Sequence, residues 1–203
     1  LYTLDTRNSA SRTGLHIAVS PLFPGDVVDV DGMRVTSIAR TAIDLSRGLA
    51  LPAALIALDG ALRAGETQAS LFRVALNLKQ WRGTKTLRSS IPYASSLSES
   101  ALESAARGTC IAAGLPLPDL QVTIEGASGR AYRVDMVWRN ERLILEPDGW
   151  LKYGETERER RSNFKAEKLR EDDLRAAGYR VLRVTWEGLS NLSGLVAGQL
   201  RNS

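Results

Sequence analysis

Cysteine and histidine are almost absent from this sequence, which contains one residue of each type in 203. A single thiol, Cys110, cannot close an internal disulfide, and one cysteine with one histidine cannot supply the ligands of a zinc site. Any metal ion bound by the chain must therefore be a hard cation held by carboxylates and water. The lack of paired cysteines and of a recognisable signal peptide predicts a cytoplasmic protein.

Long hydrophobic runs are also missing. The longest mainly apolar stretch, Leu49 to Leu62, is interrupted by Pro52, Asp59 and Gly60 and is too short to cross a bilayer. The overall composition, 43% hydrophobic and 25% charged, is typical of a globular protein and excludes a disordered chain. A formal net charge of +4 permits contact with nucleic-acid phosphates without requiring it.

Turn residues and composition predict two units. Residues 1–80 are expected to form a small α/β unit that includes a hairpin around Asp31-Gly32. Residues 81–97 are basic and polar and are expected to be a linker. Residues 98–203 are expected to form the second unit, with helices at 98–113, at 157–177 and at the C-terminal end, and strands at 120–125, 132–138, 142–147 and 180–186. This order predicts an α/β (α+β) protein with a mixed sheet flanked by helices.

Three carboxylates are predicted to meet at one end of that sheet. Glu146 and Asp148 are two positions apart on one strand and so project to the same face, while Asp135 lies near the end of the neighbouring strand. Like charges this close are unfavourable unless a cation lies among them or they share a proton, which favours a site for Mg²⁺ or Mn²⁺. Such an ion activates water for phosphodiester hydrolysis. A structural alternative stays open, because Asp148-Gly149 is also a common turn and Asp135 can cap a strand end.

Five segments of the second unit, in order along the chain, carry a resemblance to a known family. They are SESALE (98–103), GLPLPDLQ (114–121), RVD (133–135), EPDGWLKYG (146–154) and EKLREDDLRAAGYRVLRVTW (167–186). With VDGMRVTSIARTAIDL (30–45) in the first unit, they resemble actinobacterial AbiEi-type proteins of type IV toxin-antitoxin systems. The C-terminal domain of that family is similar to very-short-patch-repair endonucleases of the PD-(D/E)XK superfamily. The resemblance implies a restriction-endonuclease-like fold, DNA as a partner and a cognate toxin protein as a second one.

The resemblance also implies roles for individual residues. Asp135 and Glu146 take the positions of the two metal carboxylates, and Asp148 stands where the superfamily carries a lysine. Lys152 is expected to fold back into the role of that lysine, and Gln121 to orient water or a phosphate.

Glu103 takes the position of the acidic residue on the first helix of the superfamily, with Glu99 as a weaker candidate. Glu103 also has structural alternatives, namely a solvated helix face or an i,i+4 pair with Arg107.

Several basic and aromatic residues are candidates for nucleic-acid contact. The expected site is followed by two aromatic residues and then by an arginine cluster, and the linker contains a further basic pair. Each has a structural alternative, since charge runs are usually solvated helix faces and loop aromatics usually pack against their own domain. The candidates are Trp150, Tyr153, Arg158, Arg160, Arg161, Arg82 and Lys85.

Three further residues are given structural roles. Trp138 and Trp186 lie among strand residues and are expected in the core. Arg183, on the last strand, has an ion pair as its structural role and contact with a phosphate backbone as the open alternative.

Taken together, the sequence predicts a DNA-interacting protein without a membrane segment that acts as a divalent-metal-dependent endonuclease. The alternative is a non-catalytic DNA-binding antitoxin or regulator that retains a nuclease-like fold, and a third hypothesis is a module that binds only other proteins.

Overall fold

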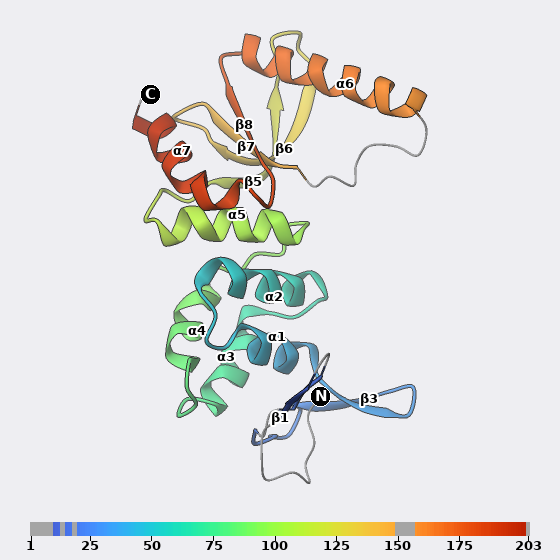
Figure 1. The fold of residues 1–203 in the computed structure, drawn as a ribbon, viewed down its shortest axis with the longest axis vertical. Helices are drawn as coiled ribbons and strands as arrows, with labels where there is room; N and C mark the ends of the chain where they lie inside the picture. Colours follow the sequence, from blue (N-terminus) through green and yellow to red (C-terminus); the bar gives the residue numbers. More distant parts are fainter. Residues whose placement is uncertain (1–9, 13–14, 18–19, 149–156, 202–203) are drawn as a thin grey trace.

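The computed structural model describes residues 10–12, 15–17, 20–148 and 157–201, with the backbone alone at 10–17 and 157–164. Within these residues the protein is a mixed α/β (α+β) protein in which a mainly helical first unit packs against a second unit built around a sheet (Figure 1). The fold class predicted from the sequence is confirmed. No helix in the described residues is long and apolar enough to cross a membrane.

The first unit begins with two short antiparallel hairpins and continues with helices. Its elements are β1 (Ala10–Arg12), β2 (Leu15–Ile17), β3 (Val27–Val30), β4 (Met33–Thr36), α1 (Ile38–Ser46), α2 (Leu51–Arg63), α3 (Gln68–Asn77), α4 (Thr84–Ser90) and the short 3₁₀ helix η1 (Ile91–Tyr93). The predicted hairpin is β3–β4: Asp31 and Gly32 both adopt positive φ, as a tight two-residue turn requires.

The stretch expected to be a linker is folded. Residues 84–93 form α4 and η1, and the side chains of Leu87 and Ile91 are buried in the same core as α1, α2 and α3. The sequence signal for α4 is weak, because this seven-residue helix presents a single large apolar side chain among threonine, serine and basic residues.

The second unit is a four-stranded mixed sheet covered on both faces. Its elements are α5 (Ala101–Ala112), β5 (Asp119–Glu125), β6 (Ala131–Trp138), β7 (Leu143–Pro147), α6 (Glu157–Ala176), β8 (Arg180–Val184) and α7 (Leu189–Arg201). The strand order is β5-β6-β7-β8: β6 pairs antiparallel with β5 and with β7, and β8 pairs parallel with β7. Helices α5 and α7 lie on one side of the sheet and α6 on the other (Figure 1).

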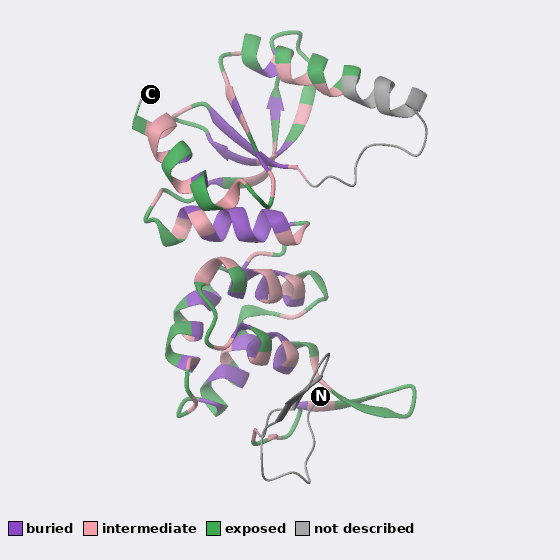
Figure 2. Ribbon diagram, viewed as in Figure 1, coloured by how far each residue is buried: buried purple, intermediate pink, exposed green. Residues whose placement is uncertain are grey.

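Each face of the sheet has its own core. Cys110 of α5 and Leu192 of α7 pack with Met136 and Leu145 on one face, whereas Leu174 of α6 packs with Ile144 on the other. Strand β7 is buried along its whole length, and the last three residues of β6 beside it are buried as well (Figure 2). Burial also raises the pKa of the Cys110 thiol to about 12, so this group is protonated at neutral pH.

The two tryptophans expected in the core differ. Trp138 is buried, and its indole nitrogen donates a hydrogen bond to the carbonyl of Pro116 at 2.8 Å. Trp186 is 49% exposed, so its predicted core position is wrong. Strand β8 ends at Val184, and Trp186 therefore lies in the turn that leads to α7, outside both core layers.

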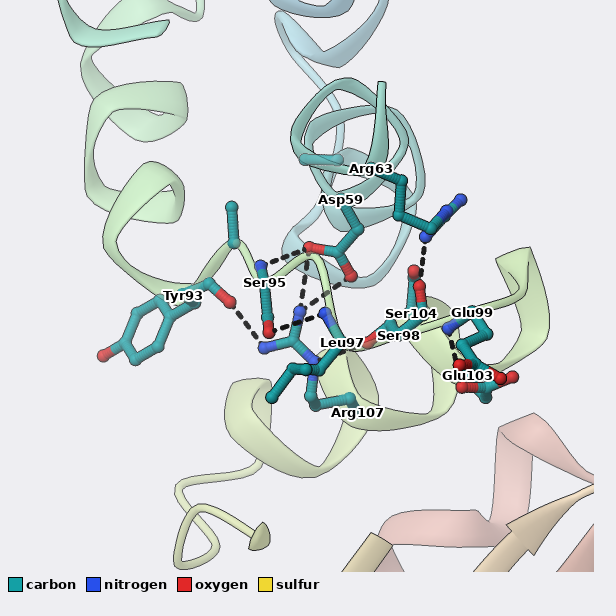
Figure 3. Close-up of polar contacts among 12 residues, drawn as sticks. Asp59, Arg63, Tyr93, Ser95, Leu97, Ser98, Glu99, Glu103, Ser104 and Arg107 are labelled. Carbon is teal, nitrogen blue, oxygen red and sulfur yellow. Dashed lines mark hydrogen bonds and ion pairs between the residues drawn. The ribbon is translucent and has the colours of Figure 1, made fainter. Parts of the chain in front are cut away.

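Helices α2 and α5 form the contact between the units. Gly108 of α5 lies so close to α2 that a Cβ atom built on it would come within 2.6 Å of the Cα atom of Pro52. Beside this crossing, Arg107 of α5 pairs with Asp59 of α2, with both side chains almost fully buried (Figure 3). A backbone approach this close requires a glycine at the crossing point.

Candidate active site

The end of the four-stranded sheet brings the three predicted carboxylates to one cavity. Asp135 directly precedes Met136, whose partner on β7 is Leu145, so Asp135 and Glu146 continue the same antiparallel register. A cavity of about 240 Å³ is lined by Arg133, Asp135, Glu146, Pro147, Asp148, Glu167, Arg170 and Arg183. The structure thus places Asp135, Glu146 and Asp148 around a common space.

Gln121 connects this cavity to helix α5. Its amide nitrogen donates to Asp135 Oδ1 at 3.3 Å and to Glu103 Oε2 at 3.0 Å. Gln121 has a φ of +51°, a left-handed conformation that is unusual for a residue within a strand. The three side chains therefore form one hydrogen-bonded row across α5, β5 and β6.

Glu103 is held in this row at the start of α5. It is 8% exposed, and its Oε2 atom also accepts a hydrogen bond from the backbone N–H of Glu99 at 2.8 Å (Figure 3). The alternative of a solvated helix face is therefore wrong. The alternative i,i+4 pair is also wrong, because Arg107 turns to the first unit and bonds both carboxylate oxygens of Asp59.

Glu146 is buried and held by an arginine from the opposite layer. It is 8% exposed, and Arg170 of α6 places Nη2 2.5 Å from its Oε1 atom and Nη1 3.0 Å from its Oε2 atom. The contact to Oε1 is an ion pair without hydrogen-bond geometry, so Oε1 is buried without a hydrogen-bond donor. Arg170 Nη2 also donates to the carbonyl oxygen of Arg133 at 2.6 Å.

Arg183 of β8 forms ion pairs with the rest of the acidic lining, which is the structural role of its two alternatives. It lies in register with Glu146 on the parallel strand β7. Its guanidinium contacts four carboxylates, those of Glu167, Glu171 at 3.2 Å, Asp148 at 3.4 Å and Glu146 at 3.9 Å. Burial alone would lower the pKa of Arg183, but the hydrogen bond to Glu167 and the surrounding negative charges outweigh it and raise the pKa.

The carboxylates, as they stand, do not fit a metal ion. Their oxygens are the donors that a hard cation prefers. The guanidinium groups of Arg170 and Arg183 are bound to Glu146 and Asp148, however, and no three His, Cys, Asp or Glu side chains among the described residues are placed to hold a metal. The magnesium or manganese site stays a prediction, and two of its three expected ligands, Glu146 and Asp148, are paired with arginine.

The expected nucleic-acid contacts are not gathered at this cavity. Arg82 and Lys85 are exposed at the start of α4 in the first unit and do not line it. Trp150, Lys152 and Tyr153 lie outside the described residues. The backbone of residues 158–161 belongs to the first turns of α6, but the side chains of Arg158, Arg160 and Arg161 are also outside the described part.

Sequence reasoning missed the contribution of helix α6 to the cavity. Glu167, Arg170 and Glu171 all face the strand ends, on the same side of the helix as the buried Leu174. Their spacing of three and four positions is the available signal. In a run of mixed charges, the same spacing is equally compatible with a solvated helix face. The burial of Leu174 against the sheet shows which face of α6 points inward.

The chain is similar to known proteins whose names state no activity. The chain is 35% identical over 157 residues to the uncharacterized proteins MT2308 and Rv2248 of Mycobacterium tuberculosis, strains CDC 1551 and H37Rv. The match covers 72% of this chain and 58% of each relative, so the chain spans less than two thirds of their length. No family model matches the chain, and no solved structure matches it.

Proposed function

We propose that the protein is a cytoplasmic, divalent-metal-dependent endonuclease that hydrolyses phosphodiester bonds of DNA at the cavity beside Asp135. The observation that supports this most is the convergence of Asp135, Glu146 and Asp148 on one cavity of about 240 Å³, although they come from two strands and the residue that follows β7. Three carboxylates this close, with Glu146 buried and Asp135 and Asp148 half-buried, are unfavourable unless positive charge compensates them.

The neighbouring groups suit phosphodiester chemistry. The amide nitrogen of Gln121 donates its two hydrogens to Glu103 and Asp135, so its carbonyl oxygen is the group that can orient a water molecule beside the cavity. The guanidinium groups of Arg133, Arg170 and Arg183 line the same space, and a planar guanidinium binds phosphate oxygens in a bidentate manner.

A second candidate function is a DNA-binding antitoxin or regulator that retains this fold without cleaving and acts with a cognate toxin protein. The pairing of Glu146 with Arg170 and of Asp148 with Arg183 favours it, because both carboxylates are already neutralised within the chain. The position of Asp148, where a catalytic lysine is expected, also favours it.

One experiment separates the two. Purified protein is incubated with supercoiled plasmid and labelled duplexes in Mg²⁺, Mn²⁺ or EDTA, and Asp135→Asn is compared with Asp119→Asn. Asp119 is a matched control, since it is exposed on the adjacent strand and its ion pair is with Arg139, away from the cavity. Metal-dependent nicking that is lost in Asp135→Asn and kept in Asp119→Asn supports the nuclease.

Salt-sensitive binding in gel shifts, without nicking in any metal, supports the regulator instead. Absence of both binding and cleavage at low salt contradicts both functions.

A further inference from the structure

The excess positive charge of the chain is gathered in one segment of the first unit. Residues 67–98 contain five of the 27 basic residues and none of the 23 acidic residues. We propose that α4 and the turn before it, together with the end of α1, form a separate surface that binds the phosphate backbone of a nucleic-acid duplex, whatever its sequence. This basic patch consists of Arg47, Arg82, Lys85 and Arg88. None of the four lines the cavity of the second unit, so the inference does not rest on chemistry at that cavity.

The turn before α4 lies directly against the end of α1. A Cβ atom built on Gly83 would come within 2.6 Å of the backbone nitrogen of Gly48 and 3.2 Å of the Cγ atom of Arg47. Gly83 also has a φ of +83°, so a glycine is required at this approach. The contact places Arg47 over Trp81, with the guanidinium carbon 5.1 Å from the centroid of the ring. Arg47 is thereby held beside the turn that carries Arg82.

Helix α4 extends the patch along one side of the first unit (Figure 1). Lys85 and Arg88 are three positions apart and are therefore neighbours on the helix surface, beside the exposed residues Thr86 and Ser89. The large apolar side chain of this helix, Leu87, is buried. Lysine, arginine, serine and threonine are the side chains that contact phosphates, whereas a protein interface or a membrane surface requires exposed aromatic or apolar residues. The composition of the exposed face therefore favours a nucleic acid.

The charges of the patch are not compensated by carboxylates in the described part of the chain. Within that part, none of the four side chains forms an ion pair, and the Nη1 atom of Arg47 is buried without a hydrogen-bond acceptor. Asp44, three positions before Arg47, is bound to Arg40 instead. The arginines that line the cavity, by contrast, are all paired with carboxylates. A phosphate backbone therefore meets uncompensated positive charge at the patch rather than at the cavity.

Binding through such a patch should depend strongly on salt and weakly on sequence. Each cation that neutralises a phosphate of B-form DNA releases counterions, so the logarithm of the affinity falls by about 0.9 per unit of log salt for each phosphate neutralised. Trp81 packs against the core of the first unit and is covered by Arg47, so its ring is not an open platform for a base. The patch is therefore expected to read charge along the backbone rather than base edges.

The test is binding of a fluorescein-labelled DNA duplex to the full chain in EDTA, measured by fluorescence anisotropy at several salt concentrations. The patch variant is Arg82→Gln/Lys85→Gln, in which both altered side chains are exposed. The matched control is Arg139→Gln/Arg175→Gln, which removes the same charge from two exposed arginines that already pair with carboxylates. Circular dichroism verifies that each variant is folded.

We expect the patch variant to bind the duplex at least about tenfold more weakly than the unmodified protein at low salt, and the slope of log affinity against log salt to become shallower by about two. The control variant should match the unmodified protein. Duplexes of unrelated sequence should give the same affinities. Asp135→Asn should bind no more weakly than the unmodified protein, because the cavity is not part of the patch.

Three results overturn the inference: unchanged affinity in the patch variant, equal losses in the patch and control variants, or no duplex binding by the unmodified protein at low salt. Patch-dependent binding of equal strength to polyglutamate, or to vesicles of phosphatidylcholine and phosphatidylserine, also overturns it. If the protein nicks plasmid while the patch variant binds as tightly as the unmodified protein, the inference fails and the proposed nuclease stands. Patch-dependent duplex binding with no cleavage in any metal supports the inference and contradicts the nuclease.

Discussion

At the scale of single residues, the buried pair of Asp59 and Arg107 connects the two units. Arg107 Nη2 lies 2.9 Å from Oδ1 and 2.7 Å from Oδ2 of Asp59, and the backbone N–H of Ser95 donates to the same Oδ1 atom at 2.8 Å. Arg107 also donates to the carbonyl oxygen of Tyr93 and to Ser98 Oγ (Figure 3). One aspartate thus satisfies groups from α5 and from the segment that leads to it.

Replacing Asp59 by alanine should lower the free energy of unfolding by about 3–5 kcal/mol, because Arg107 would remain buried without its counter-charge. The measurement is urea unfolding followed by circular dichroism. Asp119→Ala is the control: its pair with Arg139 is more than half exposed on both sides and should contribute less than about 1 kcal/mol. Equal midpoints for the two variants would show that the buried pair contributes no more than a surface pair.

At the scale of the elements, the crossing of α2 and α5 depends on Gly108. Glycine within a helix is ordinarily unfavourable relative to alanine by about 0.8–1.0 kcal/mol. Here the missing Cβ allows α5 to lie against the backbone of Pro52 and the side chain of Leu55. The close packing of α5 on α2 offsets the lower helix propensity of glycine at this position.

Gly108→Ala should therefore destabilise the protein by about 1–3 kcal/mol, the usual range for overpacking a rigid contact. Gly194→Ala in α7 is the matched control, because a Cβ there meets nothing within 4 Å, and it should stabilise by about 0.5–1 kcal/mol. The measurement is thermal unfolding, in which Tm should fall for Gly108→Ala and rise for Gly194→Ala. A Gly108→Ala variant that is more stable than the unmodified protein would mean that α2 and α5 can move apart without lowering the free energy of unfolding.

At the scale of the whole molecule, the two units should unfold together. Their contact combines the buried Asp59–Arg107 pair, the Gly108 crossing and a hydrogen bond from Arg63 to the carbonyl oxygen of Ser98. A junction of this kind couples the cores on its two sides, and coupled cores melt as one cooperative unit.

We expect native-state hydrogen exchange to give one common opening free energy for the most protected amides of α3 in the first unit and β6 in the second. The Asp59→Ala variant should separate the two values, because it weakens the junction and leaves both cores intact. Different values in the unmodified protein would instead identify two independent domains.

Much of this architecture could be predicted from the sequence. The hairpin turn at Asp31-Gly32 and the β5 to α7 order follow from local turn chemistry and from the period of the apolar residues, and the structure reproduces both. Helix α4 was not predicted, since it is a short helix stabilised mainly by burial of Leu87 in a core contributed by other helices. The sequence also predicts a core position for Trp186, which is wrong. The residues before Trp186 are typical of a strand, but the strand ends at Val184.

The alternation of side chains along a strand was enough to place the carboxylates Asp135 and Glu146 at one end of the sheet. It did not fix every strand end, since β8 stops at Val184. Only the tertiary structure decided what those carboxylates face. Arg170 and Glu167 belong to a helix whose inner face is defined by packing against the sheet, and Arg183 meets Glu146 through the register of two parallel strands separated by that helix. These contacts depend on how segments far apart in the sequence pack together. The spacing of residues within one helix or strand does not determine that packing.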